Sequence, residues 1–341
     1  MAKLILKNGM QFDAKSFGAA SNAAGEVVFS TGMMGYPESL TDPSYKGQIL
    51  TLTYPLVGNY GVPSKKFWEA DKIMVSGLIV SDYIDTPSHF QSENTLAKWF
   101  INEGIPLLQI KDTRLLTQII REKGTMLGKI IFGEDIEFYD PNTENLVEKV
   151  STKKIIEDGE GGKTLILIDC GAKRNIQRAL VERGVKVIVV PWDFDPFKLE
   201  KFDAVVISNG PGVPKFCGPT VSNIKKLLDK KIPTLGICLG HQLLALASGG
   251  DTKKLKYGHR SQNQPCIQEG TKRCYITTQN HGFCVSKTPQ GFKPWFTNAN
   301  DGTNEGLIHK TLPFMSVQFH PEATPGPTDA EWIFDFFLEK I

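Results

Sequence analysis

The segment whose residues are best suited to catalysis contains a cysteine between two glycines, where an apolar strand meets an apolar-striped helix. The strand is expected over Pro233–Ile237 and the helix over Leu239–Ser248, with Cys238 at the junction. The spacing of Gly236 and Gly240 around Cys238 is that of a nucleophile elbow, a tight turn that any side chain on those glycines would crowd. The helix N-terminus favours the thiolate, which is the reactive form. Cys238 is therefore the candidate nucleophile.

The alternative interpretation of Cys238 is a small buried hydrophobe, which is how most free cysteines behave. The flanking glycines and the strand–helix junction favour the nucleophile. The five other cysteines lack that context and are interpreted as structural: Cys170, Cys217, Cys266, Cys274 and Cys284. The absence of any Cys-x-x-Cys pair argues against a zinc site, and no metal is expected.

A thiolate nucleophile needs a base, and the outstanding candidate among six histidines is His320. It follows an apolar strand expected over Phe314–Phe319, and Glu322 comes two residues later, beyond the extended backbone at Pro321. A carboxylate placed in this way can hold the far N–H of the imidazole and set its tautomer. Cys238, His320 and Glu322 thus form a candidate triad. Three other histidines have ordinary structural explanations: His89 in a polar loop, His241 packing on the elbow helix and His309 at a strand end.

Amide hydrolysis also needs donors for the tetrahedral oxyanion. A Gly-rich loop, Ser208–Gly212, follows the strand expected over Ala204–Ile207. Loops at the carboxyl ends of neighbouring parallel strands meet above the sheet. The backbone N–H of Gly210 is therefore expected beside that of Leu239, while Pro211 stiffens the loop and cannot donate.

The surrounding elements predict an α/β protein of two domains. In the second half, short apolar strands alternate with helices, which is typical of a doubly wound, mostly parallel sheet carrying the elbow. The first half is a β-rich α/β domain with Gly- and Pro-rich turns and two helices. The domains are predicted over residues 1–150 and 163–341, with the polar stretch 148–162 as a linker.

Further elements are expected as follows: strands at Leu4–Leu6, Val27–Ser30, Ile49–Tyr54, Ile73–Val80, Thr164–Ile168 and Val185–Val190; helices at Asn94–Glu103, after Asp112 with Leu115, Leu116, Ile119 and Ile120 on one face, and at Lys173–Arg183, Thr220–Lys230 and Thr328–Lys340; hairpins from Arg273 to Phe319.

The net charge and the distribution of apolar residues indicate which kinds of partner the protein is expected to have. A net charge of +2 gives no reason to expect nucleic acid binding. Neither a membrane-spanning run nor a secretory signal is expected, which predicts a cytoplasmic protein with reduced thiols. Gly159, Gly162, Lys163 and Thr164 resemble a phosphate-binding loop only superficially, because they precede a strand where such a loop must follow one.

Taken together, these motifs resemble those of the class I glutamine amidotransferases. The matching segments are SNGPG at 208–212, GICLGHQLLALASGG at 236–250 and HPEA at 320–323. Nearly the whole chain resembles the family of small, glutamine-hydrolysing subunits of carbamoyl-phosphate synthetases. This narrower resemblance is carried by TGMMGYPESLTDPSYKGQILTLTYPLVGNYG in the first domain, QNHGF at 279–283 and HPEATPGP at 320–327.

The resemblance implies that Cys238 attacks the side-chain amide of L-glutamine, forming a glutamyl thioester, while His320 shuttles the proton and Glu322 orients it. It implies the following glutamine contacts: Ser44, Gly210, Gly212, Leu239, Gln242, Asn280, Gly282 and Phe283. Because Ser44 belongs to the first domain, the site is expected where the domains meet.

The resemblance further implies a heterodimer in which ammonia passes to a large synthetase subunit. That subunit is expected to use ATP, Mg²⁺ and bicarbonate to make carbamoyl phosphate for arginine and pyrimidine synthesis, and no cofactor is expected on this chain. Two positions depart from the family pattern: Val213 stands where Asp is common, and Ser261 where Gly is usual. Both are expected to affect loop geometry and partner contacts rather than catalysis.

Two rival functions are considered. One is a stand-alone cysteine hydrolase on the same elbow fold, either a peptidase or a γ-glutamyl hydrolase, for which the first domain has no evident use. The other is a non-catalytic regulatory subunit, which the intact Cys238, His320 and Glu322 disfavour.

Overall fold

The computed structural model describes residues 2–341, which divide into two compact units. The first unit runs to Thr143 and includes Lys256–Arg260; the second contains Glu144–Leu255 and Ser261–Ile341. The division therefore precedes the limit expected at residue 150. The interpretation of 148–162 as a linker is wrong for β10 (Ile156–Asp158), which pairs with β12 in the second unit. This strand is exposed throughout and is held by backbone pairing. Its sequence therefore has no apolar periodicity from which a strand could be predicted.

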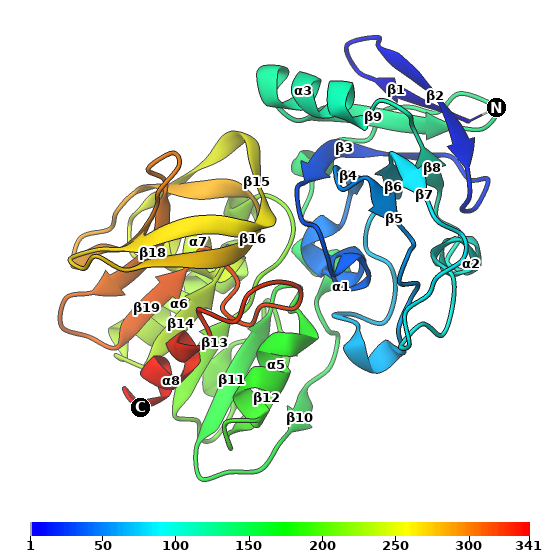
Figure 1. Cartoon of the computed structure of the whole chain (residues 1–341). Helices are drawn as coiled ribbons and strands as arrows, with labels where there is room; N and C mark the ends of the chain where they lie inside the picture. The colour runs from blue at the N-terminus through cyan, green and yellow to red at the C-terminus, as the bar shows by residue number, and fades with distance from the viewer. Residues whose placement is uncertain (1) are drawn as a thin grey trace. The chain divides into compact units, whose positions relative to one another are not determined.

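The first unit is built on a closed barrel with the strand order β1-β2-β8-β6-β4-β3-β9 (Figure 1). Its strands are β1 (Ala2–Leu6), β2 (Gln11–Ser16), β3 (Ala23–Ser30), β4 (Gln48–Leu52), β6 (Gly77–Val80), β8 (Leu107–Gln109) and β9 (Met126–Ile131); β5 (Leu56–Val57) and β7 (Asp82–Tyr83) form a separate pair. The barrel closes between β1 and β9, where Leu4 pairs with Ile130 and both side chains are buried. Closure removes the sheet edges that an open β-rich domain would expose.

Three helices accompany the barrel: α1 (Tyr36–Thr41), α2 (Leu96–Asn102) and α3 (Thr113–Lys123). The predicted cap of α3 is confirmed, because the Asp112 side chain accepts from the Leu115 N–H and Gly124 ends the helix. The placement of Leu115 on the apolar face is wrong, since it is 39% exposed while Leu116 and Ile120 are buried. The strand predicted at Ile73–Val80 is shorter and begins only at Gly77.

The second unit contains a ten-stranded sheet in the order β10-β12-β11-β13-β14-β19-β18-β16-β15-β17. Its strands are β11 (Thr164–Asp169), β12 (Lys186–Pro191), β13 (Ala204–Ile207), β14 (Thr234–Ile237), β15 (Asp251–Gln268), β16 (Cys274–Lys287), β17 (Phe292–Asn298), β18 (Asn304–His309) and β19 (Phe314–Val317), besides β10. The five strands from β12 to β19 are parallel, and antiparallel strands extend the sheet beyond them. Sequence analysis missed β15, because its long run of charged and polar residues lacks an apolar alternation.

Helices cover both faces of the parallel strands, which confirms the predicted doubly wound architecture. The helices are α4 (Val147–Val150), α5 (Arg174–Val181), α6 (Gly218–Asp229), α7 (Leu239–Ala247) and α8 (Trp332–Leu338). Alternate residues of β11 face opposite sides: Leu165 and Leu167 share a core with α5 and α8, whereas Ile166 and Ile168 share one with α6 and α7. The strand–helix alternation thus gives two apolar cores on either side of one sheet.

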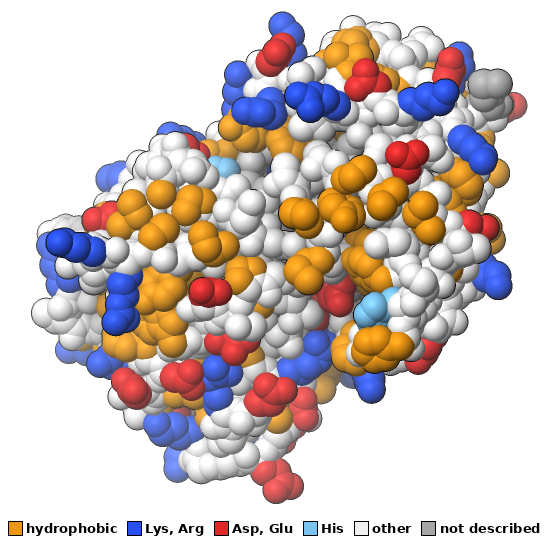
Figure 2. Space-filling view, in the orientation of Figure 1, with side chains coloured by type: hydrophobic (Ala, Val, Ile, Leu, Met, Phe, Trp, Pro, Cys, Tyr) orange, Lys and Arg blue, Asp and Glu red, His pale blue; other side chains and the backbone are white. Residues whose placement is uncertain are grey.

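Charged side chains of both signs are interspersed on the face of the molecule shown in Figure 2. The whole chain has 39 basic and 37 acidic side chains, so its charge is balanced in total as well as on this face. Within residues 2–341, no helix combines the length and the apolar character needed to cross a membrane.

Candidate active site

The turn between β14 and α7 has the geometry of a nucleophile elbow. Cys238 adopts φ 53° and ψ −100°, a strained conformation for a residue with a side chain. A Cβ on Gly236 would lie 2.5 Å from the carbonyl oxygen of Gly240, and one on Gly240 would lie 2.2 Å from that of Ile207. Both contacts are far too short, so the predicted need for glycine on each side of the cysteine is confirmed.

The sulfur of Cys238 is buried and has two polar neighbours. Sγ lies 3.8 Å from the carbonyl oxygen of Asn280 and 3.6 Å from Nε2 of Gln318. The backbone N–H of Cys238 donates to the carbonyl of Val317 at 2.8 Å, which ties the elbow to β19. The sulfur is thus fixed at the carboxyl ends of the central parallel strands, where ligands bind in open α/β sheets.

The structure brings His320 and Glu322 together as predicted. Nδ1 of His320 lies 2.6 Å from Oε1 of Glu322, and both side chains are almost completely buried. Burial alone would lower the pKa of the imidazole, but the charges of Glu322 and of a Cys238 thiolate outweigh it and raise that pKa. Nε2 of His320 has no hydrogen-bond partner among the described residues. It is therefore the nitrogen left for proton exchange with the sulfur and the substrate.

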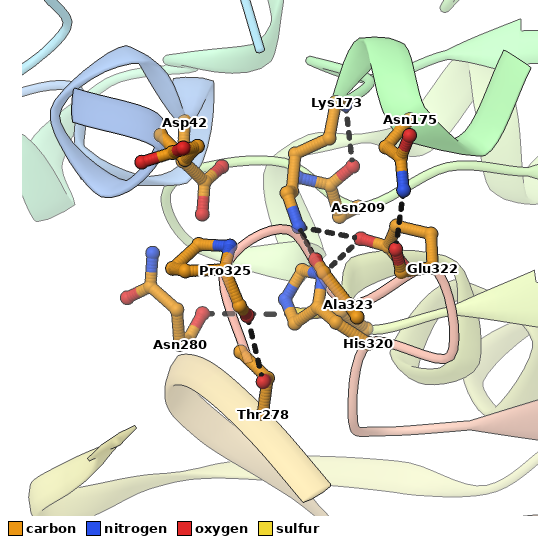
Figure 3. Close-up of polar contacts among 12 residues, drawn as sticks. Asp42, Lys173, Asn175, Asn209, Thr278, Asn280, His320, Glu322, Ala323 and Pro325 are labelled. Atoms are coloured by element: carbon orange, nitrogen blue, oxygen red, sulfur yellow. Dashed lines mark hydrogen bonds and ion pairs between the residues drawn. The ribbon is translucent and has the colours of Figure 1, made fainter. Parts of the chain in front are cut away.

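Sequence analysis missed a buried lysine that completes this arrangement. Nζ of Lys173 lies 3.0 Å from Oε1 of Glu322 and also donates to the carbonyl of Ala323 (Figure 3). Its backbone N–H donates to Oδ1 of Asn209 at 3.0 Å. Burial would raise the pKa of the Glu322 carboxyl, but Lys173 and His320 overcome that and lower it. The position of Lys173 just before a helix, at the carboxyl end of β11, carried no sequence signal that pointed to Glu322.

The backbone of Gly210 lies close to the side chain of Leu239. A Cβ on Gly210 would lie 2.9 Å from Cδ2 of Leu239 and 2.0 Å from the carbonyl oxygen of Cys170. Only glycine therefore fits where the loop passes over the start of α7. Within residues 2–341, neither the Gly210 nor the Leu239 backbone N–H donates to a protein acceptor. Both donors are available to a ligand oxygen.

The residues expected to hold glutamine come from three segments of the second unit. Gly210 and Gly212 lie in the loop after β13, Leu239 and Gln242 on α7, and Asn280, Gly282 and Phe283 on β16. The side-chain N–H₂ of Gln242 donates to the carbonyl of Phe283 at 2.8 Å and to Oε1 of Gln318 at 2.9 Å. The amide oxygen of Gln242 thus remains available to a substrate.

Ser44, the remaining expected contact, belongs to the first unit. It lies buried in a short 3-10 turn, Pro43–Tyr45, where its backbone N–H donates to Oδ1 of Asp42 at 2.9 Å. Its contribution to a glutamine site stays a prediction.

The two departures from the family pattern are accommodated locally. Val213 precedes the 3-10 turn Pro214–Phe216 and provides no side-chain cap, which an Asp there could supply. Ser261 is buried, and its hydroxyl accepts from the side chain of Gln264 at 3.0 Å. Neither residue contacts the triad, which agrees with the expected limit of their effect.

His241, on the elbow helix, and the five cysteines other than Cys238 are predicted to have structural roles. His241 is buried, and its Nδ1 lies 2.9 Å from Oγ of Ser316, so its interpretation as a packing residue is confirmed. All six cysteines are free thiols. Cys170, Cys217, Cys266 and Cys284 are buried, and Cys274 is exposed.

Two family models match the chain. The model described as carbamoyl-phosphate synthase small chain, CPSase domain, matches residues 4–130. The model described as glutamine amidotransferase class-I matches residues 166–340. The two matched regions fall in the first and second units and include the elbow, His320 and Glu322.

Similar curated proteins align with the chain from end to end. It is 46% identical to the carbamoyl phosphate synthase arginine-specific small chain of Chaetomium globosum, over 100% of this chain and 78% of that protein. It is 49% identical to the multifunctional protein CAD of Squalus acanthias over 99% of this chain, and 46% identical to the human mitochondrial carbamoyl-phosphate synthase [ammonia] over 100% of it. The chain spans only 16% and 24% of the lengths of these last two proteins.

Proposed function

The chain belongs to the family of carbamoyl-phosphate synthase small chains, and from that premise we propose that it hydrolyses L-glutamine to glutamate and ammonia. The observation that carries the proposal is the buried arrangement of Cys238 on its elbow, His320, and Glu322 at 2.6 Å from the imidazole. A strained nucleophile, a base and an orienting carboxylate are the parts that acyl transfer from an amide requires.

In the first half of the reaction, the Cys238 thiolate attacks the side-chain carbonyl carbon of glutamine. The negative charge that develops on the carbonyl oxygen is held by the N–H groups of Gly210 and Leu239. The carbon–nitrogen bond breaks as Nε2–H of His320 gives its proton to the departing nitrogen. Ammonia leaves, and the glutamyl group stays on the sulfur as a thioester.

In the second half, water attacks the thioester while the now neutral Nε2 of His320 accepts its proton. The carbon–sulfur bond breaks, glutamate is released and Cys238 regains its resting form. Glu322 keeps the imidazole in one tautomer throughout by accepting from Nδ1, and Lys173 keeps Glu322 ionised. No proton has to pass to Glu322 in either half.

Recognition of the substrate follows from the polar groups around the sulfur. The free amide oxygen of Gln242 is an acceptor suited to the α-ammonium group of glutamine, since its N–H₂ already donates to two protein oxygens. Gly212 adopts φ 85°, which glycine tolerates best. Ser44 is assigned to the same site by the resemblance described above.

The ammonia is passed, in this proposal, to a large synthetase subunit that uses ATP, Mg²⁺ and bicarbonate to make carbamoyl phosphate. The name "carbamoyl phosphate synthase arginine-specific small chain", carried by two relatives that match the full length of this chain, supports that partner. The Gly-Lys-Thr at 162–164 leads into β11 rather than following a strand, which supports placing the phosphate chemistry on the partner. Six free thiols support a cytoplasmic, reducing location for this heterodimer.

Family membership alone does not assign the nitrogen donor, because one relative carries the qualifier "ammonia" in its name. The triad geometry favours glutamine for this chain. A stand-alone cysteine hydrolase on the same fold remains the main rival; it would act on peptides or γ-glutamyl conjugates and be indifferent to a synthetase.

The test is covalent labelling with a glutamine-like diazoketone, followed by peptide mapping. We expect one adduct, on Cys238, and protection by L-glutamine. The exposed thiol of Cys274 is the internal control, because it is accessible but has no adjacent base. An adduct mainly on Cys274, or labelling that glutamine does not prevent, would contradict the proposed nucleophile.

A further inference from the structure

Gln318 is a fully buried polar residue that the reaction described above does not use. It follows β19 directly and lies two residues before His320, and its backbone N–H donates to the carbonyl of Glu305 at 2.8 Å. Its side chain extends toward α7, where it meets Gln242 and the sulfur of Cys238. A buried amide costs free energy unless its polar atoms are paired, so the pairing defines its role.

The orientation of both side-chain amides is fixed by one backbone carbonyl. The carbonyl of Phe283 can only accept, so the group of Gln242 that faces it at 2.8 Å must be the N–H₂. That same N–H₂ faces Gln318 at 2.9 Å, so Gln318 must present its oxygen there. The N–H₂ of Gln318 is then left to face Sγ of Cys238 at 3.6 Å. Flipping either amide would set two donors or two acceptors against each other.

The sulfur therefore has one neighbour suited to each of its protonation states. A thiol can donate S–H to the carbonyl of Asn280, at 3.8 Å, whereas a thiolate can only accept and is repelled by that oxygen. The N–H of Gln318 suits the thiolate, because a hydrogen bond to a charged acceptor is stronger than one to a neutral acceptor. Sγ of Cys238 can accept this N–H whether or not it carries a proton.

We infer that Gln318 is a further catalytic residue, which donates a hydrogen bond to the sulfur of Cys238 and stabilises it as the thiolate that attacks the substrate. This inference rests on the proposed function, in which that thiolate is the nucleophile. The same bond would favour the sulfur as leaving group when the thioester is hydrolysed, since the carbon–sulfur bond breaks to give the thiolate again.

The charged and titratable groups that face the sulfur must be considered with Gln318. His320 lies on one side, with Glu322 and Lys173 behind it. From β16 the carbonyl of Asn280 faces the sulfur, and from α7 the neutral Gln242 contacts Gln318. Removing the amide of Gln318 leaves every charge in place and removes two hydrogen bonds, the one to the sulfur and the one from Gln242. Only the first acts on the sulfur directly, so a pH-dependent change in alkylation reports on it.

The experiment measures the rate at which iodoacetamide alkylates Cys238 in the purified full chain between about pH 3.5 and about pH 9, a range that includes the pH values at which activated thiols in proteins ionise. Peptide mass spectrometry quantifies Cys238 and the exposed Cys274 in the same digest, so Cys274 serves as an internal reference. The variants are Gln318→Met, which keeps the length of the side chain without an N–H, and Gln318→Leu in case the first fails to fold. Thermal unfolding checks both.

Ser316→Ala is the matched control. Ser316 lies on β19 two residues before Gln318, is also buried and also contacts α7, but its partner is His241 rather than the sulfur. The control therefore disturbs the same packing without removing a donor to Cys238.

We expect Gln318→Met to move the midpoint of the Cys238 profile up by about one pH unit, which is about tenfold slower alkylation at pH values well below the midpoint of the unaltered chain. The difference should vanish at high pH, where the sulfur is ionised in both proteins. Ser316→Ala should leave the midpoint unchanged.

Superimposable profiles for Gln318→Met and the unaltered chain would overturn the inference and leave the proposed function standing. A rate loss that is equal at every pH, or a midpoint shift of the same size in Ser316→Ala, would assign Gln318 a packing role only. If Cys238 in the unaltered chain reacts no faster than Cys274 at neutral pH, the proposed nucleophile itself fails.

Discussion

The ammonium group of Lys173 lies 3.0 Å from the carboxylate of Glu322, and neither side chain is accessible to solvent. Removing two charges from water is costly, so such a pair persists only where further contacts satisfy both partners. Here the Glu322 carboxylate also accepts from His320, and Lys173 also donates to the carbonyl of Ala323 (Figure 3). The triad is in effect extended by one cation, which keeps its carboxylate ionised.

Replacement of Lys173 by Met should therefore damage both stability and activity. The variant leaves the buried Glu322 carboxylate without its lysine partner, which is expected to cost about 3–5 kcal/mol in the free energy of unfolding. Glutaminase activity should fall because Glu322 no longer stays ionised beside the imidazole. Urea unfolding and a glutamate-release assay measure the two effects.

The control for that variant is Lys226→Met, which breaks the solvent-exposed pair with Asp195 and should cost less than about 1 kcal/mol. Equal losses in the two variants would mean that Lys173 does not hold a buried charge.

Acidification should remove the contribution of Glu322 to stability. Its pKa is lower in the folded protein than its ordinary value of 4.5, because Lys173 and His320 overcome the effect of burial. The unfolded chain thus binds the proton more readily, so the contribution is complete above pH 4.5 and is lost as the pH falls below it. Glu322→Gln lacks this contribution at every pH. The difference in melting temperature between the two proteins should narrow on acidification; a widening difference would reverse the assigned sign.

Much of the site could be predicted because its signals are local. Gly236 and Gly240 mark the elbow by their spacing around Cys238, and Glu322 lies only two residues from His320. The alternation of short apolar strands with helices likewise predicts the parallel sheet, since both of its faces are buried.

Lys173 and Gln318 could not be found in this way, because their partners are distant in sequence. Gln318 reaches a sulfur 80 residues away, and a lone Lys or Gln beside a strand carries no pattern of its own. Closure of the barrel depends on the long-range pairing of β1 with β9, and the polar strands β10 and β15 form through backbone hydrogen bonds that leave no apolar period.

Substitution of Gly210 by Ala should reduce turnover by displacing an oxyanion donor. Its new Cβ would lie 2.0 Å from the Cys170 carbonyl oxygen, so the loop and its N–H must shift. Loss of one oxyanion donor costs about 10²-fold or more in kcat. Steady-state kinetics should show this loss in kcat with a smaller change in KM.

Gly218→Ala is the matched substitution, since a Cβ there meets no atom within 4 Å and the residue opens α6 at an unstrained position. It should leave kcat unchanged. A comparable loss in Gly218→Ala would show that the assay reports general loop damage.

Substitution of the base, His320, should reduce glutaminase activity more than substitution of its orienting group, Glu322. His320→Asn should abolish glutamine hydrolysis almost as completely as Cys238→Ser, because each removes a group that touches the reacting atoms. Glu322→Gln should retain more activity, since the proton acceptor survives. The double variant His320→Asn, Glu322→Gln should be no worse than His320→Asn alone, because residues that act as a unit are not additive. Losses that simply multiply would mean that the two act independently.

The most direct test of the proposed function couples this chain to a synthetase. The purified chain is mixed with a large synthetase subunit, ATP, Mg²⁺ and bicarbonate, and glutamate and carbamoyl phosphate are followed together. We expect slow glutamine hydrolysis by the free chain, faster hydrolysis with the partner, and one carbamoyl phosphate for each glutamate. Cys238→Ser should lose the glutamine-dependent reaction while added ammonia restores carbamoyl phosphate formation. A free chain that is already at full speed and unaffected by the synthetase would contradict the account and favour the stand-alone hydrolase.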